Sequence, residues 1–190
     1  ESAIESPEDL ANVPVTVGYQ SGSHYSTIQG LEPFLKPEEI DLHFGGLLMG
    51  RLDLLVDRGV PAGNAFGAPM YILEQLGFRK ILDTTFMIAT MVPPNVNRDD
   101  VVKYFMALKR AQGDIDLRHD LYTHYFLNEL PERYQEIADT RRFGPGERIV
   151  FEPYSKEIFD GTREWIIERD IFPEDKIGAD GYDHAVVTAA

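Results

Sequence analysis

The chain has 190 residues, enough for one large domain or two small ones with a buried core. Its 32 Asp and Glu residues against 18 Lys and Arg residues give a formal net charge of −14, which excludes a general nucleic-acid binder because polyphosphates attract basic surfaces. A hydrophobic fraction of 43% excludes a disordered acidic chain, and no apolar run approaches the roughly 20 residues that insert across a membrane.

The first half of the sequence alternates strand patterns with helix patterns. Valines at every second position of 13–18 predict a strand, and the polar turn from Gln20 to Ser26 leads into a helix. The pattern then repeats, with a strand expected at 40–44, a short strand or extended loop at 60–66, helices at 47–56 and 69–76, and extended segments at 80–84 and 86–92. Such alternation predicts an α/β fold with a mostly parallel sheet.

From Asn97 onward, helical patterns dominate. Asn97 is a candidate N-cap for a helix that reaches Ala111. Further helices are expected at 117–128, 131–139 and 155–169. These patterns divide the chain into an α/β ligand-binding lobe (7–92), a helical part (93–172) and a loop-like tail (173–190).

The strongest candidate site is the turn Ser21-Gly22-Ser23-His24, followed by Tyr25. A small anion could accept hydrogen bonds there from backbone N–H groups at the positive end of the helix dipole, from two hydroxyls and from one imidazole. The alternative is that the serines only cap the helix and that His24 is a surface histidine of its first turn.

A second group of candidates lies in and just after the segment 60–66. Asn64, Phe66 and Tyr71 lie in or beside a segment rich in glycine and proline, where an amide and aromatic rings can line a cleft for an organic ligand. Core packing is the competing interpretation, because aromatic residues beside glycine and alanine more often fill space.

Metal and cofactor sites are not expected. The chain has no cysteine, and His119 and His124 are five positions apart, whereas two ligands on one helical face stand three or four apart. Arg141 and Arg142 could grip a ligand carboxylate, but in so acidic a chain they have many carboxylates with which to pair.

The order of these motifs resembles the second lobe of type II periplasmic binding proteins, in the branch for nitrate, sulfonates, taurine and thiamine precursors. The leader, strand, Gly-Ser turn and helix that open that lobe are matched from Pro7 to Tyr25. The family's cleft segments correspond to Gly59–Ala62 and Phe66–Pro69, although Pro61 and Ala68 replace the family's two acidic residues there. A strand at 86–92 that returns to the first lobe follows in the family's order.

The resemblance implies a fold whose first lobe is largely absent from this chain. A second chain, a second copy or a removed N-terminal fragment would supply it. It also implies two functions. The first is a solute-binding module for a small organic anion, serving an ABC transporter. The alternative is an enzyme on the same scaffold, a decarboxylase, desulfinase or hydrolase acting on a small aromatic acid, with His24 as general acid or base assisted by Ser23.

The compartment stays open at this stage. A cysteine-free chain is compatible with either redox environment. The first residues lack the regions of a signal peptide, and Glu1 is not an initiator methionine, so we expect that upstream sequence was removed or omitted. A trimmed solute-binding protein would be periplasmic, and an enzyme subunit would be cytoplasmic.

Overall fold

The computed structural model describes residues 3–186. They form two compact units: the first comprises the chain up to Ile88 with Arg110–Arg148, and the second comprises Ala89–Lys109 with the chain from Ile149 onward. No helix in the described range is long and apolar enough to cross a membrane.

A three-stranded parallel sheet organises the first unit. Its strands are β1 (Val15–Val17), β2 (Leu42–Phe44) and β3 (Ala62–Gly63), in the order β2-β1-β3. Val15 pairs with Leu42 on one side and with Ala62 on the other. All three β1 residues are buried, as expected for the central strand of a sheet that is covered on both faces.

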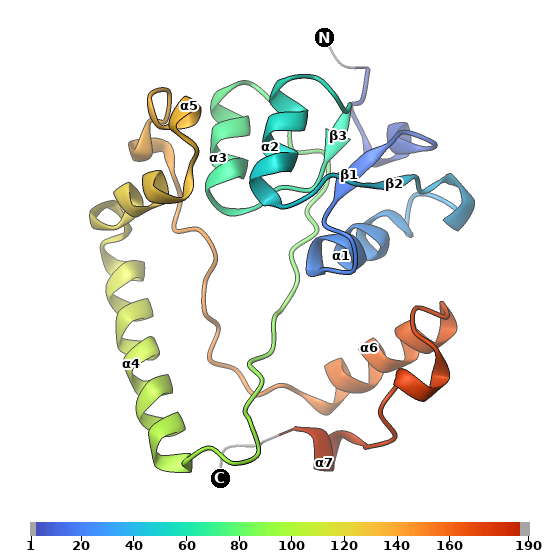
Figure 1. The fold of residues 1–190 in the computed structure, drawn as a ribbon, viewed down its shortest axis with the longest axis vertical. Helices are drawn as coiled ribbons and strands as arrows, with labels where there is room; N and C mark the ends of the chain where they lie inside the picture. Colours follow the sequence, from blue (N-terminus) through green and yellow to red (C-terminus); the bar gives the residue numbers. More distant parts are fainter. Residues whose placement is uncertain (1–2, 187–190) are drawn as a thin grey trace. The chain divides into compact units, whose positions relative to one another are not determined.

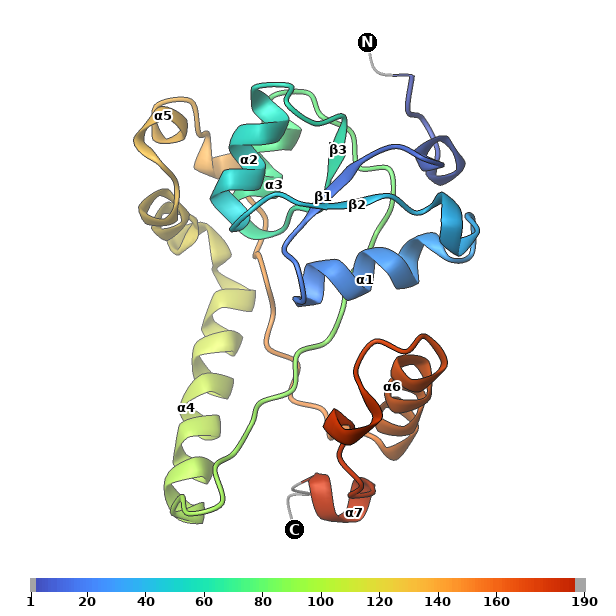
Figure 2. The same ribbon diagram turned by 45° about the vertical axis from the view of Figure 1, so that its right-hand side comes forward.

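Helices cover the two faces of this sheet (Figure 1), with α1 (Gly22–Leu31) on one face and α2 (Leu48–Val56) and α3 (Gly67–Gln75) on the other. Figure 2 shows the same layers from a second side. Each face has its own core: Val15 packs with Leu10 and Leu31, and Leu52 packs with Ile72. The predicted α/β fold is thus confirmed.

Helix-terminating residues in the sequence lie at the ends of these helices. The α1 helix ends just before Pro33, which cannot continue it. Gly77 closes α3 at φ +86°, while the Phe78 N–H donates to the Leu73 carbonyl oxygen at 2.9 Å. The predicted glycine cap is therefore present.

Short helical elements complete the first unit. Two 3-10 helices near the N-terminal strands, η1 and η2, span Pro7–Leu10 and Pro37–Glu39. The others lie between residues 119 and 142: η3 (His119–Leu121), η4 (Thr123–Glu129), α5 (Glu132–Gln135) and η5 (Thr140–Arg142). Tyr134 and Phe143, both at most 3% exposed, join the core beside α2 and α3.

The second unit is helical. The long helix α4 (Arg98–Leu117) begins in it and continues into the first unit. The others are α6 (Lys156–Glu168), η6 (Glu174–Lys176) and α7 (Tyr182–Ala185). A Ser155 hydroxyl caps α6 by accepting from the Ile158 N–H at 3.2 Å, and the Tyr182 hydroxyl donates to the Tyr154 carbonyl oxygen at 2.6 Å.

Three expectations about local structure need correction. The segments 80–84 and 86–92 are extended but belong to no strand, because no described residues pair with their backbones. The helix expected at 117–128 is instead two 3-10 helices after the end of α4. The expected loop-like tail contains η6 and α7, and its last four residues lie outside the described residues.

Candidate functional site

The candidate residues lie at the carboxyl edge of the parallel sheet. The chain leaves β1 toward β2 on one side and returns to β3 on the other, so the strand order reverses at β1. Open α/β sheets bind ligands outside the carboxyl ends of the strands at such a reversal. The turn that carries Ser21 follows β1, and Asn64 and Phe66 follow β3, so both groups of sequence candidates share this edge.

The N-terminus of α1 is not closed by its own capping residue. Ser21 is in the N-cap position, but its hydroxyl makes no capping bond and instead donates to the Gly18 carbonyl oxygen. The N–H groups of His24 and Tyr25 both donate to the Ser21 carbonyl oxygen. Among the residues that the structure describes, the N–H groups of Gly22 and Ser23 therefore have no acceptor.

Ser23 holds the turn together. Its side-chain oxygen accepts from the Gly18 N–H at 3.0 Å and lies 2.8 Å from the Ser21 hydroxyl oxygen. Its carbonyl oxygen accepts from the Thr27 hydroxyl at 2.6 Å. With only 3% of its surface exposed, Ser23 fixes the backbone that presents the free amides.

His24 presents one nitrogen to the turn and leaves the other free. The Gln20 N–H donates to His24 Nδ1 at 3.1 Å, so Nδ1 acts as an acceptor and the neutral ring carries its proton on Nε2. The imidazole contacts the rings of Tyr19 and Tyr25, with centroid distances of 5.2 and 5.0 Å. Burial lowers the pKa of His24 and raises that of Tyr25, to which Tyr19 also contributes.

The lowered pKa of His24 implies an acid-sensitive turn. A histidine that is held neutral stabilises the fold fully above its unfolded-state pKa, and this contribution is lost as the pH falls through the lower folded-state value. We expect the urea midpoint to fall between pH 7 and 5, and less so in His24→Asn, whose Oδ1 can replace Nδ1 as acceptor. An NMR-measured pKa for His24 at or above 6.5 would contradict this expectation.

Hydrogen bonds of Asn64 link the ends of β1 and β3. Its side-chain amide donates to the hydroxyls of Thr27 and Thr84, both at 3.0 Å, and so has only Oδ1 left for a ligand. Its backbone N–H extends the β1–β3 pairing by donating to the Thr16 carbonyl oxygen at 2.9 Å. Phe66 is half-buried in the N-cap position of α3.

The structure adds two residues that sequence reasoning missed. The Phe86 ring lies directly on Gly22, since a Cβ atom at position 22 would be 2.2 Å from it. Arg51 of α2 is 3% exposed, and its Nη1 would lie 2.8 Å from a Cβ atom at Gly18. Phe86 carried a weak signal as an apolar residue in a β-prone segment, whereas nothing in the sequence distinguishes Arg51 from an exposed arginine.

Several other sequence candidates lie away from this edge. Tyr71 is a core residue whose ring stacks on Phe143, and its hydroxyl accepts from the Gly146 N–H at 2.9 Å. His119 and His124 are exposed, and within residues 3–186 no group of three or more histidine or acidic side chains could hold a metal ion.

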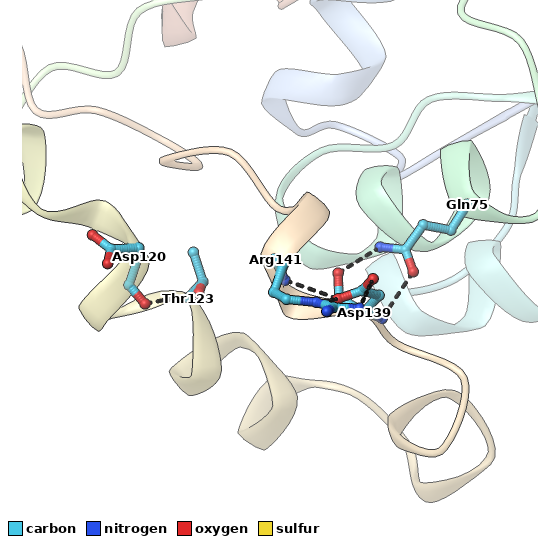
Figure 3. Close-up of polar contacts among 5 residues, drawn as sticks. All are labelled: Gln75, Asp120, Thr123, Asp139 and Arg141. Atoms are coloured by element: carbon cyan, nitrogen blue, oxygen red, sulfur yellow. Dashed lines mark hydrogen bonds and ion pairs between the residues drawn. The ribbon is translucent and has the colours of Figure 1, made fainter.

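Arg141 forms an ion pair with a carboxylate of its own chain. Its Nε and Nη2 atoms each lie 2.8 Å from a carboxylate oxygen of Asp139 (Figure 3). The Asp139 backbone in turn exchanges two hydrogen bonds with the side chain of Gln75, of 2.9 and 3.2 Å. This is the pairing expected in an acidic chain, and Arg142 beside it is exposed.

A cavity of about 480 Å³ lies in the second unit, and none of these candidates lines it. Its lining is mostly apolar and comprises Arg163, Ile167, Asp170, Phe172, Ile177 and Ala179. Arg163 donates to the Asp180 carbonyl oxygen at 3.2 Å. Because the cavity has no convergent set of polar groups, the edge of the sheet remains the better candidate.

Comparison with known proteins supports the fold. No protein-family model matches the chain, and no curated protein matches it significantly. A search of solved structures finds a periplasmic-binding-protein-like fold, so the chain has the fold of that class. The structure found is the alkanesulfonate-binding protein SsuA from Xanthomonas axonopodis pv. citri bound to MOPS, with a TM-score of 0.59 and 14% identity. The match covers 93% of this chain and 64% of that one.

Proposed function

We propose that the chain binds a small organic anion of the carboxylate or sulfonate type at the N-terminus of α1, as a solute-binding module. The observation that carries the proposal is the pair of free N–H groups of Gly22 and Ser23 at the strand-order reversal. Helix N-termini attract anions through such amides and through the helix dipole. The likeness to an alkanesulfonate-binding protein supports the same ligand class.

The surroundings of these amides suit an anion with an organic part. In the proposed complex the oxyanion accepts from the two N–H groups, and His24 can donate from Nε2. The two serine hydroxyls stabilise the turn instead, because Ser21 donates to the Gly18 carbonyl oxygen and Ser23 then donates to the Ser21 oxygen. The apolar part of the ligand then lies against aromatic rings, which Tyr25 and Phe86 provide beside the turn and Phe66 provides at the neighbouring strand end. Asn64 holds the two strand ends in register.

The negative net charge does not oppose this proposal. At physiological ionic strength exposed charges are screened over about 8 Å, so distant carboxylates have little effect at the turn. The ionic contacts of Asp41 and Asp83, two acidic residues of the first unit, are with His43 and Lys80. A local array of donors therefore determines the preference for an anion.

The test is a comparison of two ligands with the same shape and different charge. Calorimetric titration of the whole chain should show that ethanesulfonate binds at least tenfold more tightly than ethyl methyl sulfone, its neutral analogue, because the free amides favour a full negative charge. MOPS, acetate and benzoate extend the series to a larger sulfonate and to carboxylates. Equal affinity for the sulfonate and the sulfone would contradict an anion site.

One observation favours the alternative enzyme. His24 is held neutral with its Nε2 proton free, a state in which an imidazole can donate a hydrogen bond to negative charge that develops on a bound substrate. Ser23 is an unsuitable nucleophile because its oxygen is already engaged by Gly18 and Ser21. Turnover of small aromatic acids that disappears in His24→Ala would establish the enzyme, whereas binding without product would establish the receptor.

The proposal also includes partners. A solute-binding module would deliver its ligand to an ABC transporter and would be periplasmic, and a second chain or second copy would complete the first lobe. The exposed apolar side chains near the end of the first unit support such a contact, since Met87 and Ile88 are 60% and 81% exposed. The native mass, measured by light scattering, shows whether the protein is an assembly.

A further inference from the structure

Arg51 is a buried cation without a counter-ion. Its residue is 3% exposed, and arginines that are so deeply buried are almost always paired with an acidic group. Among residues 3–186, no aspartate or glutamate forms an ion pair with it. By contrast Arg133, which is partly exposed, pairs with Asp53 of helix α2 and with Asp57, the residue that follows this helix.

The partners of Arg51 are neutral and use only part of its hydrogen-bonding capacity. Nε donates to the Asn64 carbonyl oxygen at 3.1 Å, and Nη1 donates to the Gly46 carbonyl oxygen at 3.3 Å. A guanidinium has five N–H donors, so these two bonds leave donors unused. Burial lowers the pKa of Arg51, the direction expected for a desolvated cation, yet a guanidinium stays protonated.

The guanidinium lies beside the turn that opens α1. A Cβ atom at Gly18 would be 2.8 Å from Arg51 Nη1, 3.0 Å from the Ser21 hydroxyl oxygen and 3.3 Å from the Ser23 hydroxyl oxygen. The cation and the two hydroxyls therefore surround the same backbone position. The free amides of Gly22 and Ser23 follow within the same turn.

We propose that Arg51 is the buried counter-charge of the anion site at the N-terminus of α1. This inference rests on the proposed function and sharpens it. The bound oxyanion balances the positive charge of Arg51, so the site selects ligands by full negative charge and rejects neutral isosteres. Arg51 is a positioning residue and not a direct ligand contact. Its guanidinium donates to carbonyl groups in the loops after β2 and β3 and so fixes these loops beside the turn.

If Arg51 supplies a counter-charge, its replacement should affect ligand binding and stability differently from the replacement of a purely structural arginine. Replacing a buried cation that has no counter-ion by an apolar residue of similar length removes the cost of burying the charge, which offsets the loss of its two hydrogen bonds to carbonyl groups. Arg51→Met should therefore unfold at an unchanged or higher urea concentration, while its affinity for ethanesulfonate falls at least tenfold. Inorganic sulfate should raise the unfolding midpoint of the parent but not that of Arg51→Met.

Two further variants keep the test decisive. Arg58→Met makes the same charge change at the exposed end of α2 and should retain the parent's affinity. Arg51→Lys retains the positive charge but loses the planar guanidinium group, so it should keep the preference for ethanesulfonate over ethyl methyl sulfone. This variant tests the role of the charge even if Arg51→Met does not fold. Its affinity should lie between those of the parent and Arg51→Met.

The outcomes separate this inference from the function on which it rests. Parent-like ethanesulfonate affinity in Arg51→Met, or loss of the sulfonate preference in Arg51→Lys, overturns the role of Arg51 and leaves the anion site standing. A marked loss of stability in Arg51→Met with unchanged selectivity assigns Arg51 a structural role only. Failure of the parent to bind ethanesulfonate, MOPS or sulfate overturns both.

Discussion

Replacing Gly45 by alanine is expected to lower the free energy of unfolding by about 1–3 kcal/mol, as overpacking of a filled core does. A Cβ atom at this position would lie 1.6 Å from the Thr16 hydroxyl oxygen and 3.0 Å from Arg51 Cγ. Thr16 is 1% exposed, so its side chain cannot move without loss of core packing. The Gly45 N–H donates to the Val17 carbonyl oxygen at 3.0 Å, so the backbone of Gly45 cannot move without weakening this hydrogen bond. Urea unfolding of the whole chain measures the loss.

A mutant cycle tests the stated cause. Thr16→Ala removes the hydroxyl with which the new methyl group collides, so the double variant should lose less stability than the two single variants together. Thr16 Oγ1 is a buried oxygen without a hydrogen-bond partner, so its removal breaks no bond. Gly113→Ala is the control, because a Cβ there meets open space and should stabilise α4 by up to about 1 kcal/mol. Similar stabilities for Gly45→Ala and Gly113→Ala would refute the packing argument.

The strand–turn–helix start of the fold could be predicted because its signals are local. Alternating valines mark the strand, and Ser21 and Gly22 mark the helix start within a few residues. The function of Ser21 could not be predicted. A serine before a helix usually caps it, but here the Gly18 carbonyl oxygen, three residues earlier, takes the hydroxyl and the helix amides stay free.

Features that depend on distant segments escaped prediction. The apolar, β-prone residues at 86–92 carry a strand signal, but a strand also requires a partner backbone, which propensity cannot supply. From the sequence, Arg51 would be placed on the exposed face of an apolar helix. It is buried because Gly18, Gly46 and Asn64, from other segments of the chain, pack around its guanidinium. Both residues that the sequence analysis missed, Phe86 and Arg51, meet the turn across long sequence separations.

Replacing Gly22 by alanine is expected to lower the affinity for ethanesulfonate at least tenfold. The Cα–Cβ bond of a helical residue tilts toward the helix N-terminus, so the new methyl group would project to the end where the free amides meet the ligand. It would also lie 2.2 Å from the Phe86 ring and force that ring away. Loss of one hydrogen bond to a charged ligand is worth about 1.5–3 kcal/mol, which corresponds to tenfold or more. Calorimetric titration measures the change.

The double variant Gly22→Ala/Phe86→Ala separates the two effects of that methyl group. Phe86→Ala makes room for it, so the double variant should recover most of the stability that Gly22→Ala loses. It should still bind at least tenfold more weakly than Phe86→Ala alone, because the methyl group obstructs the amides whether or not the ring is present. Gly161→Ala, in open space on α6, is the matched control and should bind like the parent. If the double variant bound as tightly as Phe86→Ala, displacement of Phe86 would explain the loss in Gly22→Ala, and direct contact between the anion and the amides of Gly22 and Ser23 would be refuted.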